Sequence, residues 1–182
     1  MRRAPEAQLT RRQIVLTAGT LTALSALAQA PADARVKAKL TITMARFAQW
    51  PATAFATPDD ALLVCVANRT DMLSDAFAEL EGQTTAGRSV RVVSNPGKDI
   101  KACHVLFVHE SAERAAAAAL SALANTPVLT IGDGEGFAAR GGMVELVNVN
   151  DTIRFDINLK ALRAAQIGMS SQVLKLARQV RE

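Results

Sequence analysis

Four short apolar runs of strand length, separated by helical or turn sequence, set the fold class of this 182-residue chain. They are ALLVCVA (61–67), RSVRVVS (88–94), CHVLFVH (103–109) and PVLTI (127–131). An uninterrupted apolar run is typical of a strand that is covered on both faces. Between the strands, apolar residues at helical spacing predict a helix over Asp71–Glu81, and we expect Ser111 to cap a helix that continues through an alanine run to Leu123. This alternation predicts an α/β domain with a mixed, largely parallel central sheet and helices on both faces.

The C-terminal part of the chain changes pattern. The stretch MVELVNVNDTIRFDINL predicts a β-hairpin that turns at Asn150-Asp151. In its second strand, Ile153, Phe155, Ile157 and Leu159 point one way, and Thr152, Arg154, Asp156 and Asn158 point the other way. The first set is expected to face the core. The second set is expected to face water or a partner.

Three further helices are predicted. The first covers Val36 to Gln49 and is stopped by Pro51, and the second covers Lys160 to Gln166. The third is a terminal helix over Ser170 to Arg181. It is expected to bury Val173, Leu176, Ala177 and Val180.

The N-terminus resembles an export signal. Four arginines (Arg2, Arg3, Arg11 and Arg12) precede an uncharged run from Gln13 to Gln29, and small residues that suit cleavage follow. Residues 1–34 are therefore predicted to be a signal peptide, cleaved after residue 28 or after residue 34. The adjacent arginines permit a twin-arginine route as well as a Sec route. Residues 35–182 then form a single domain that we expect in the periplasm.

Charge and composition argue against nucleic-acid binding. Half of the formal net charge of +4 lies in the export segment, because removing residues 1–34 takes away four arginines and two acidic residues and leaves +2. The remaining basic residues form no stripe that would suit a phosphate backbone. Aromatic residues make up only 4%, which is too few for a base-stacking platform.

The two cysteines, Cys65 and Cys103, lie in or beside apolar runs that are predicted strands. In an oxidising compartment they could form a disulfide if their strands are neighbours, since the Cα atoms must come within about 7 Å. The alternative is two buried free thiols that behave as small apolar side chains. The residues leave both interpretations open.

The stretch VLTIGDGEGFAARGG contains a G-x-G-x-x-A pattern at Gly134, Gly136 and Ala139. A dinucleotide site needs a full helix directly after such a turn. Here Gly141-Gly142 break the chain after Arg140, and a hairpin rather than a crossover is expected to follow. We therefore interpret the stretch as a structural turn and expect no cofactor.

Catalytic groups are few. His104 and His109 lie an odd number of residues apart on one predicted strand and so point to opposite faces, which prevents joint metal binding. Ser111 could be combined with a histidine as nucleophile and base, but the sequence has no nucleophile elbow and no evident oxyanion loop. The sequence therefore predicts a protein that is not an enzyme.

Three stretches together resemble the YfiR-like family of periplasmic proteins. They are MARFAQWP, CHVLFV followed by a helix, and the C-terminal run from PVLTIGDGEGFAARGG through IRFDINL to SSQVLKLARQV. The resemblance covers residues 36–180. It implies an exported, typically homodimeric domain that represses an inner-membrane diguanylate cyclase by binding its periplasmic portion.

The resemblance also implies a contact region. The strand of the F-[DE]-[IL]-N-L pattern and the C-terminal segment are linked to repression in the family, which points to Phe155, Asp156 and Asn158, with Ser171 and Leu174 as further candidates. Of these, Phe155 and Leu174 are expected in the core. The alternative function is a periplasmic sensor without a cyclase partner that binds a small ligand at the carboxyl ends of the strands.

Overall fold

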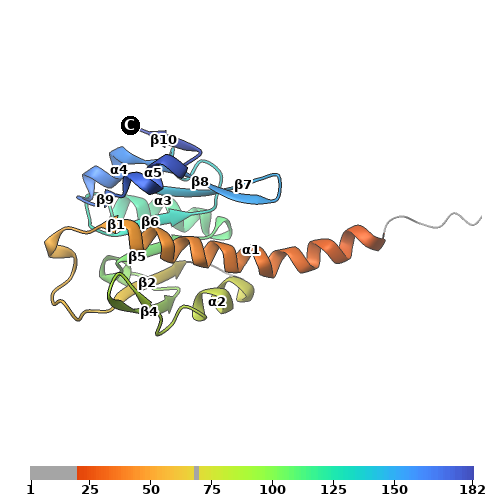
Figure 1. Ribbon diagram of the computed structural model, residues 1–182, viewed down its shortest axis with the longest axis horizontal. Coiled ribbons are helices and arrows are strands. Elements are labelled where there is room, and N and C mark those ends of the chain that lie inside the picture. Colours follow the sequence, from red (N-terminus) through yellow and green to blue (C-terminus); the bar gives the residue numbers. More distant parts are fainter. Residues whose placement is uncertain (1–19, 68–69) are drawn as a thin grey trace, which may run out of the picture.

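The computed structural model describes residues 20–67 and 70–182, with side chains from residue 32 onward (Figure 1). The four arginines of the predicted signal peptide lie outside the described residues. The elements follow in this order: α1 (Thr20–Phe47), β1 (Ala48–Gln49), η1 (Ala52–Ala54), β2 (Leu62–Ala67), α2 (Asp71–Ala78), β3 (Thr84–Thr85), β4 (Arg88–Ser94), η2 (Asp99–Ala102), β5 (Val105–Val108), η3 (Glu110–Ala112), α3 (Glu113–Ala122), β6 (Leu129–Gly132), β7 (Val144–Val149), β8 (Thr152–Asn158), α4 (Leu159–Ala164), β9 (Gly168–Met169), α5 (Ser171–Leu176) and β10 (Gln179–Arg181). None of the described helices is both long enough and apolar enough to cross a membrane.

An eight-stranded sheet in the order β10-β8-β7-β6-β5-β2-β4-β3 organises the domain. Its five central strands, from β4 to β7, are mutually parallel. The pairs β3–β4 and β7–β8 are antiparallel, and β10 runs parallel to β8. The predicted mixed, largely parallel α/β fold is confirmed. The order of the central strands is that of flavodoxin-like sheets, in which the chain reverses direction across the sheet between β2 and β5.

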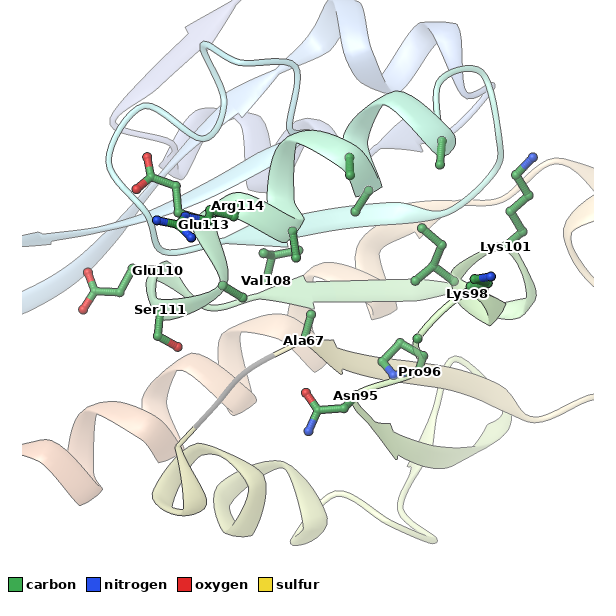
Figure 2. Close-up of a pocket in the computed structure, with 17 residues that line it drawn as sticks. Ala67, Asn95, Pro96, Lys98, Lys101, Val108, Glu110, Ser111, Glu113 and Arg114 are labelled. Atoms are coloured by element: carbon green, nitrogen blue, oxygen red, sulfur yellow. The ribbon is translucent and has the colours of Figure 1, made fainter.

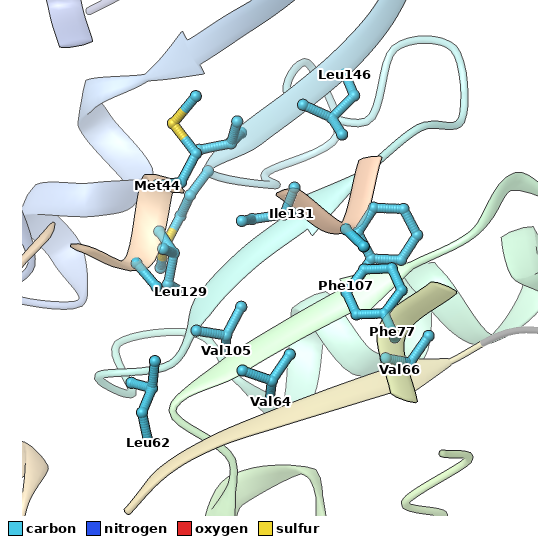
Figure 3. Close-up of a cluster of buried hydrophobic side chains, with 14 of the residues drawn as sticks. Met44, Leu62, Val64, Val66, Phe77, Val105, Phe107, Leu129, Ile131 and Leu146 are labelled. Carbon is cyan, nitrogen blue, oxygen red and sulfur yellow. The ribbon is translucent and has the colours of Figure 1, made fainter. Parts of the chain in front are cut away.

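Helices cover both faces of the sheet, as the sequence predicted (Figure 1). On one face, α1 and α2 contribute Met44 and Phe77 to a core that includes alternate residues of β2, β5 and β6 (Figure 3). The Phe77 and Phe107 rings lie 4.9 Å apart between centroids. On the other face, α3 packs over a smaller core through Ala116 and through Leu123 directly after the helix. Residues that alternate along each strand therefore enter two separate cores.

Several predicted helix boundaries were wrong. The first helix begins at Thr20 because the alanine-rich and leucine-rich sequence upstream also forms helix readily. Ser111 does not cap α3, since it belongs to the short η3 turn and its N–H donates to the side chain of His109. The predicted terminal helix ends at Leu176. After it, Arg178 N–H donates to the Phe155 carbonyl at 2.8 Å, and the chain continues as strand β10.

The glycine stretch forms a turn without a regular helix, as predicted. The expected hairpin β7–β8 follows it, but β7 also pairs in parallel with β6, so residues 133–143 are a crossover after all. The turn folds around the buried carboxylate of Glu145, which accepts from Gly136 N–H at 2.8 Å and Ala138 N–H at 2.9 Å. In a nucleotide site these N–H groups would have to donate to a phosphate. Here they donate to the carboxylate of Glu145 instead.

Candidate partner-binding surface at the C-terminal edge

The last strand, β10, forms one edge of the sheet. It pairs with β8 from Gln179 opposite Asp156 to Arg181 opposite Asn158, and no further strand covers its outer side among the described residues. An edge strand presents backbone N–H and C=O groups to another chain. The residues that the family resemblance singled out lie on the neighbouring strand β8 and on α5, the helix before β10.

Asp156 is buried rather than solvent-facing, which corrects the expectation that its strand face is wet. Its side chain is 1% exposed, and both carboxylate oxygens accept hydrogen bonds from the guanidinium of Arg178, with Nε to Oδ1 at 2.8 Å. The hydrogen bond to Asp156 raises the pKa of Arg178. Only the carboxylate is buried, since the Arg178 side chain, directly before β10, is 46% exposed. Asp156 therefore positions the edge strand.

Asn158 and Phe155 also have internal contacts. The Asn158 side chain accepts from Ala161 N–H at 3.0 Å, which caps α4, and donates to the Ala138 carbonyl at 2.8 Å. This second bond joins the end of β8 to the glycine turn. Phe155 is half-buried against the larger core, as the sequence indicated.

The remaining candidates, Ser171 and Leu174, lie on α5. Ser171 is exposed, and the hydroxyl of the neighbouring Ser170 caps the helix. Leu174 is half-buried and packs against the larger core. We call the exposed residues of α5 and β10 the C-terminal surface.

Two apolar residues of the C-terminal surface were missed by the sequence analysis. Leu176 is 71% exposed and Val180 is 37% exposed. Both were expected to be buried, because a continuous helix through residue 181 would place them on its apolar face. The sequence did contain a signal for a strand here. Polar and apolar residues alternate in Gln179-Val180-Arg181, which is the period of a strand with one polar face.

Cys65 and Cys103 form a disulfide. Cys65 lies in β2 and Cys103 lies two residues before the neighbouring strand β5, so the two Cα atoms are 5.9 Å apart. Both residues are buried in the smaller core under α3. The following residue, His104, points to the opposite side, where its ring stacks on Phe55 with centroids 4.2 Å apart. Burial lowers the pKa of His104.

The structure brings Ser111, His109 and Asp133 together at the carboxyl ends of β5 and β6. Ser111 Oγ lies 2.8 Å from His109 Nδ1, and His109 Nε2 lies 3.6 Å from Asp133 Oδ2. However, Nδ1 already accepts the backbone N–H of Ser111, and a neutral imidazole has one such lone pair. Lys37 also binds the Asp133 carboxylate at 2.6 Å. These contacts fasten α1 and the η3 turn to the sheet. They leave His109 poorly placed to take a proton from Ser111.

The described residues contain no group of three or more His, Cys, Asp or Glu side chains that could hold a metal ion. The geometry thus describes a disulfide-bonded α/β domain whose exposed strand edge and apolar side chains suit binding to another protein. A model of the YfiR/HmsC-like family (DUF4154) matches residues 34–178, and the chain belongs to this family.

No curated protein sequence matches the chain. Among solved structures, an ABC domain in complex with L-Trp from Streptococcus pneumonia is similar at 15% identity with a TM-score of 0.53, over 79% of this chain. A conserved domain protein from Vibrio cholerae O1 biovar El Tor is similar at 11% identity with a TM-score of 0.47, over 67% of this chain. This chain spans 60% of the first structure's length and 55% of the second's. The first likeness supports the α/β fold alone.

Proposed function

We propose that this protein binds the periplasmic portion of an inner-membrane diguanylate cyclase through its C-terminal surface and holds the cyclase inactive, so that cyclic di-GMP stays low. Family membership supports the class of function. The observation that carries the choice of surface is the exposure of Leu176, which ends α5 three residues before the edge strand β10. An exposed leucine next to unpaired strand groups provides both apolar contact and backbone hydrogen bonds.

The family's candidate residues have different roles in this proposal. Ser171 lies on the surface that touches the partner. Asp156 and Asn158 act indirectly: Asp156 holds Arg178 and therefore β10, and Asn158 caps α4. Phe155 and Leu174 support the same elements from the core. Their substitution would weaken partner binding by disordering the surface.

Leu176→Asp tests the proposed surface. In a strain that contains the cyclase, deletion of the gene is expected to raise cyclic di-GMP, and the Leu176→Asp protein is expected to fail to lower it again. The substitution should leave the fold intact because this side chain is mostly solvated. Cyclic di-GMP is measured by mass spectrometry, together with the periplasmic amount of each variant.

Met72→Asp is the matched control. Met72 is 49% exposed and lies on α2, away from the C-terminal edge, so this variant should repress like the wild type. Unchanged cyclic di-GMP and biofilm after deletion, with the cyclase present, would contradict the proposed function. Full repression by the Leu176→Asp protein would show that the cyclase does not bind the C-terminal surface.

A cavity of about 750 Å³ favours a second candidate function, the small-ligand sensor. It lies at the carboxyl ends of β5 and β6, and its lining includes Ser111, Gly134 and Arg140. Ligands of open α/β sheets bind at this edge. A thermal-shift screen of the purified protein with nucleotides and amino acids tests it. Stabilisation by a member of either class is the expected result, and no shift with any compound counts against a sensor.

A further inference from the structure

A groove of about 950 Å³ runs along α3, on the face of the sheet that contains the disulfide (Figure 2). It exists because the crossover from β4 to β5 contains only the four-residue turn η2. A full helix in this crossover would pack beside α3 on the sheet. The face therefore has space for a helix that this copy of the chain does not supply.

The side of α3 that lines this groove is made of small residues. Ala115, Ala118 and Ala122 are exposed there, and they recur at the spacing of one helical face. Alanine side chains let two helix axes approach to about 8 Å, the lower end of the range for packed helices. The groove can thus admit a second helix without displacing a bulky side chain.

The two ends of the groove carry opposite charge. Glu110 and Glu113 lie at the N-terminal end of α3, whereas Lys98, directly before η2, and Lys101, on η2, lie near the C-terminal end of α3 (Figure 2). Arg114 beside Glu113 reduces the charge of the acidic end but leaves it negative. Within the described part of the chain, none of these five side chains belongs to an ion pair.

We propose that a second copy of this chain occupies the groove, with the two α3 helices packed antiparallel around a two-fold axis. A two-fold contact brings the same patch of both copies together, so each acidic end meets the basic end of the other copy. In this orientation the alanines of the two copies meet at the centre, and opposite charges meet at both ends. The inference rests on the shape of the groove, its exposed alanines and the opposite charges of its ends. It does not depend on repression.

The first test compares two adjacent alanines of α3 in the exported protein, purified from the periplasm. Ala118→Glu places a long charged side chain in the groove, whereas Ala117→Glu places it on an exposed position outside the groove. The wild type and Ala117→Glu are expected to sediment as dimers in analytical ultracentrifugation. Ala118→Glu is expected to weaken self-association at least about tenfold. A monomeric wild type, or a dimer that Ala118→Glu leaves unchanged, overturns the inference.

A charge exchange tests the antiparallel arrangement. One variant carries Glu110→Lys and Glu113→Lys, and the other carries Lys98→Glu and Lys101→Glu. Each variant should be mainly monomeric, because like charges meet at both ends of its dimer, whereas an equal mixture should form heterodimers. Absence of heterodimers overturns the arrangement.

Repression is measured on the same variants. A monomeric wild type that still lowers cyclic di-GMP would contradict the proposed dimer but not the proposed function. A dimer of the expected charge behaviour that does not lower cyclic di-GMP would support the dimer and contradict the proposed function.

Discussion

At the scale of single residues, two glycines of the same turn have opposite surroundings. A Cβ atom at Gly142 would overlap the ring of Phe137, which is 1% exposed, whereas a Cβ atom at Gly134 would have its nearest neighbour at 3.6 Å. Gly142→Ala should therefore lower the free energy of unfolding by about 1–3 kcal/mol, because the buried ring must move. Gly134→Ala should change it by less than about 0.5 kcal/mol. Urea denaturation of both variants measures the difference. Equal losses would show that the ring of Phe137 does not restrict residue 142.

Residue-scale prediction succeeded where one local rule decided the outcome. The length of chain between Gly136 and Gly141 excluded a helix after the G-x-G-x-x-A pattern, and none forms. The role of Glu145 could not be predicted, because its carboxylate reaches the turn only through the parallel pairing of β6 and β7. The burial of Asp156 was missed for a similar reason. Its partner Arg178 lies in a segment whose sequence favours helix.

At the scale of elements, the charged pair Asp156–Arg178 adds to the backbone pairing that attaches β10 to β8. Asp156→Asn keeps the shape of the side chain but removes the charge that Arg178 binds. We expect this attachment to weaken by more than in the control below, because the buried carboxylate loses its charge-assisted hydrogen bonds. The amide of Arg178, which donates to Phe155, should then exchange hydrogen faster, while amides of the central strands keep their rates.

The control for this prediction is Arg163→Gln. It breaks the pair of Arg163 with Glu182, in which both side chains are well exposed, so its effect should stay below about 0.5 kcal/mol. If Asp156→Asn left the exchange of Arg178 at the wild-type rate, the Asp156–Arg178 pair would not be what holds β10.

Elements with their own periodicity were predicted, and elements that depend on a neighbour were not. The runs that became β2, β5 and β6, and the hairpin β7–β8, were visible because each has an apolar pattern several residues long. The pairs β1–β9 and β3–β4 include strands of two residues, which are too short to show a period. Strand β10 forms because β8 offers it backbone partners, which a continuous helix would leave unused.

At the scale of the whole molecule, the sequence predicted the layers but not the order of the strands. Short apolar runs that alternate with helices indicate a parallel sheet with two covered faces. They do not specify that β2 lies between β4 and β5, an order that depends on which crossovers pass over which face. This order places Cys65 beside Cys103, and so it decided between the disulfide and two free thiols.

The disulfide should contribute to the stability of the whole domain. It joins two central strands across 38 residues, and closing a loop of this length restricts the unfolded chain by about 4 kcal/mol in the chain-entropy model. Reduction with dithiothreitol should therefore lower the urea midpoint while the far-ultraviolet circular dichroism of the folded protein stays unchanged. The denaturant slope should rise, because the unfolded chain expands once the cross-link is gone.

A Cys65→Ala/Cys103→Ala variant controls for the reductant, since its unfolding should not respond to dithiothreitol. Identical midpoints for the oxidised and reduced wild type would mean that the packing of β2 against β5, rather than the cross-link, determines the stability of the sheet.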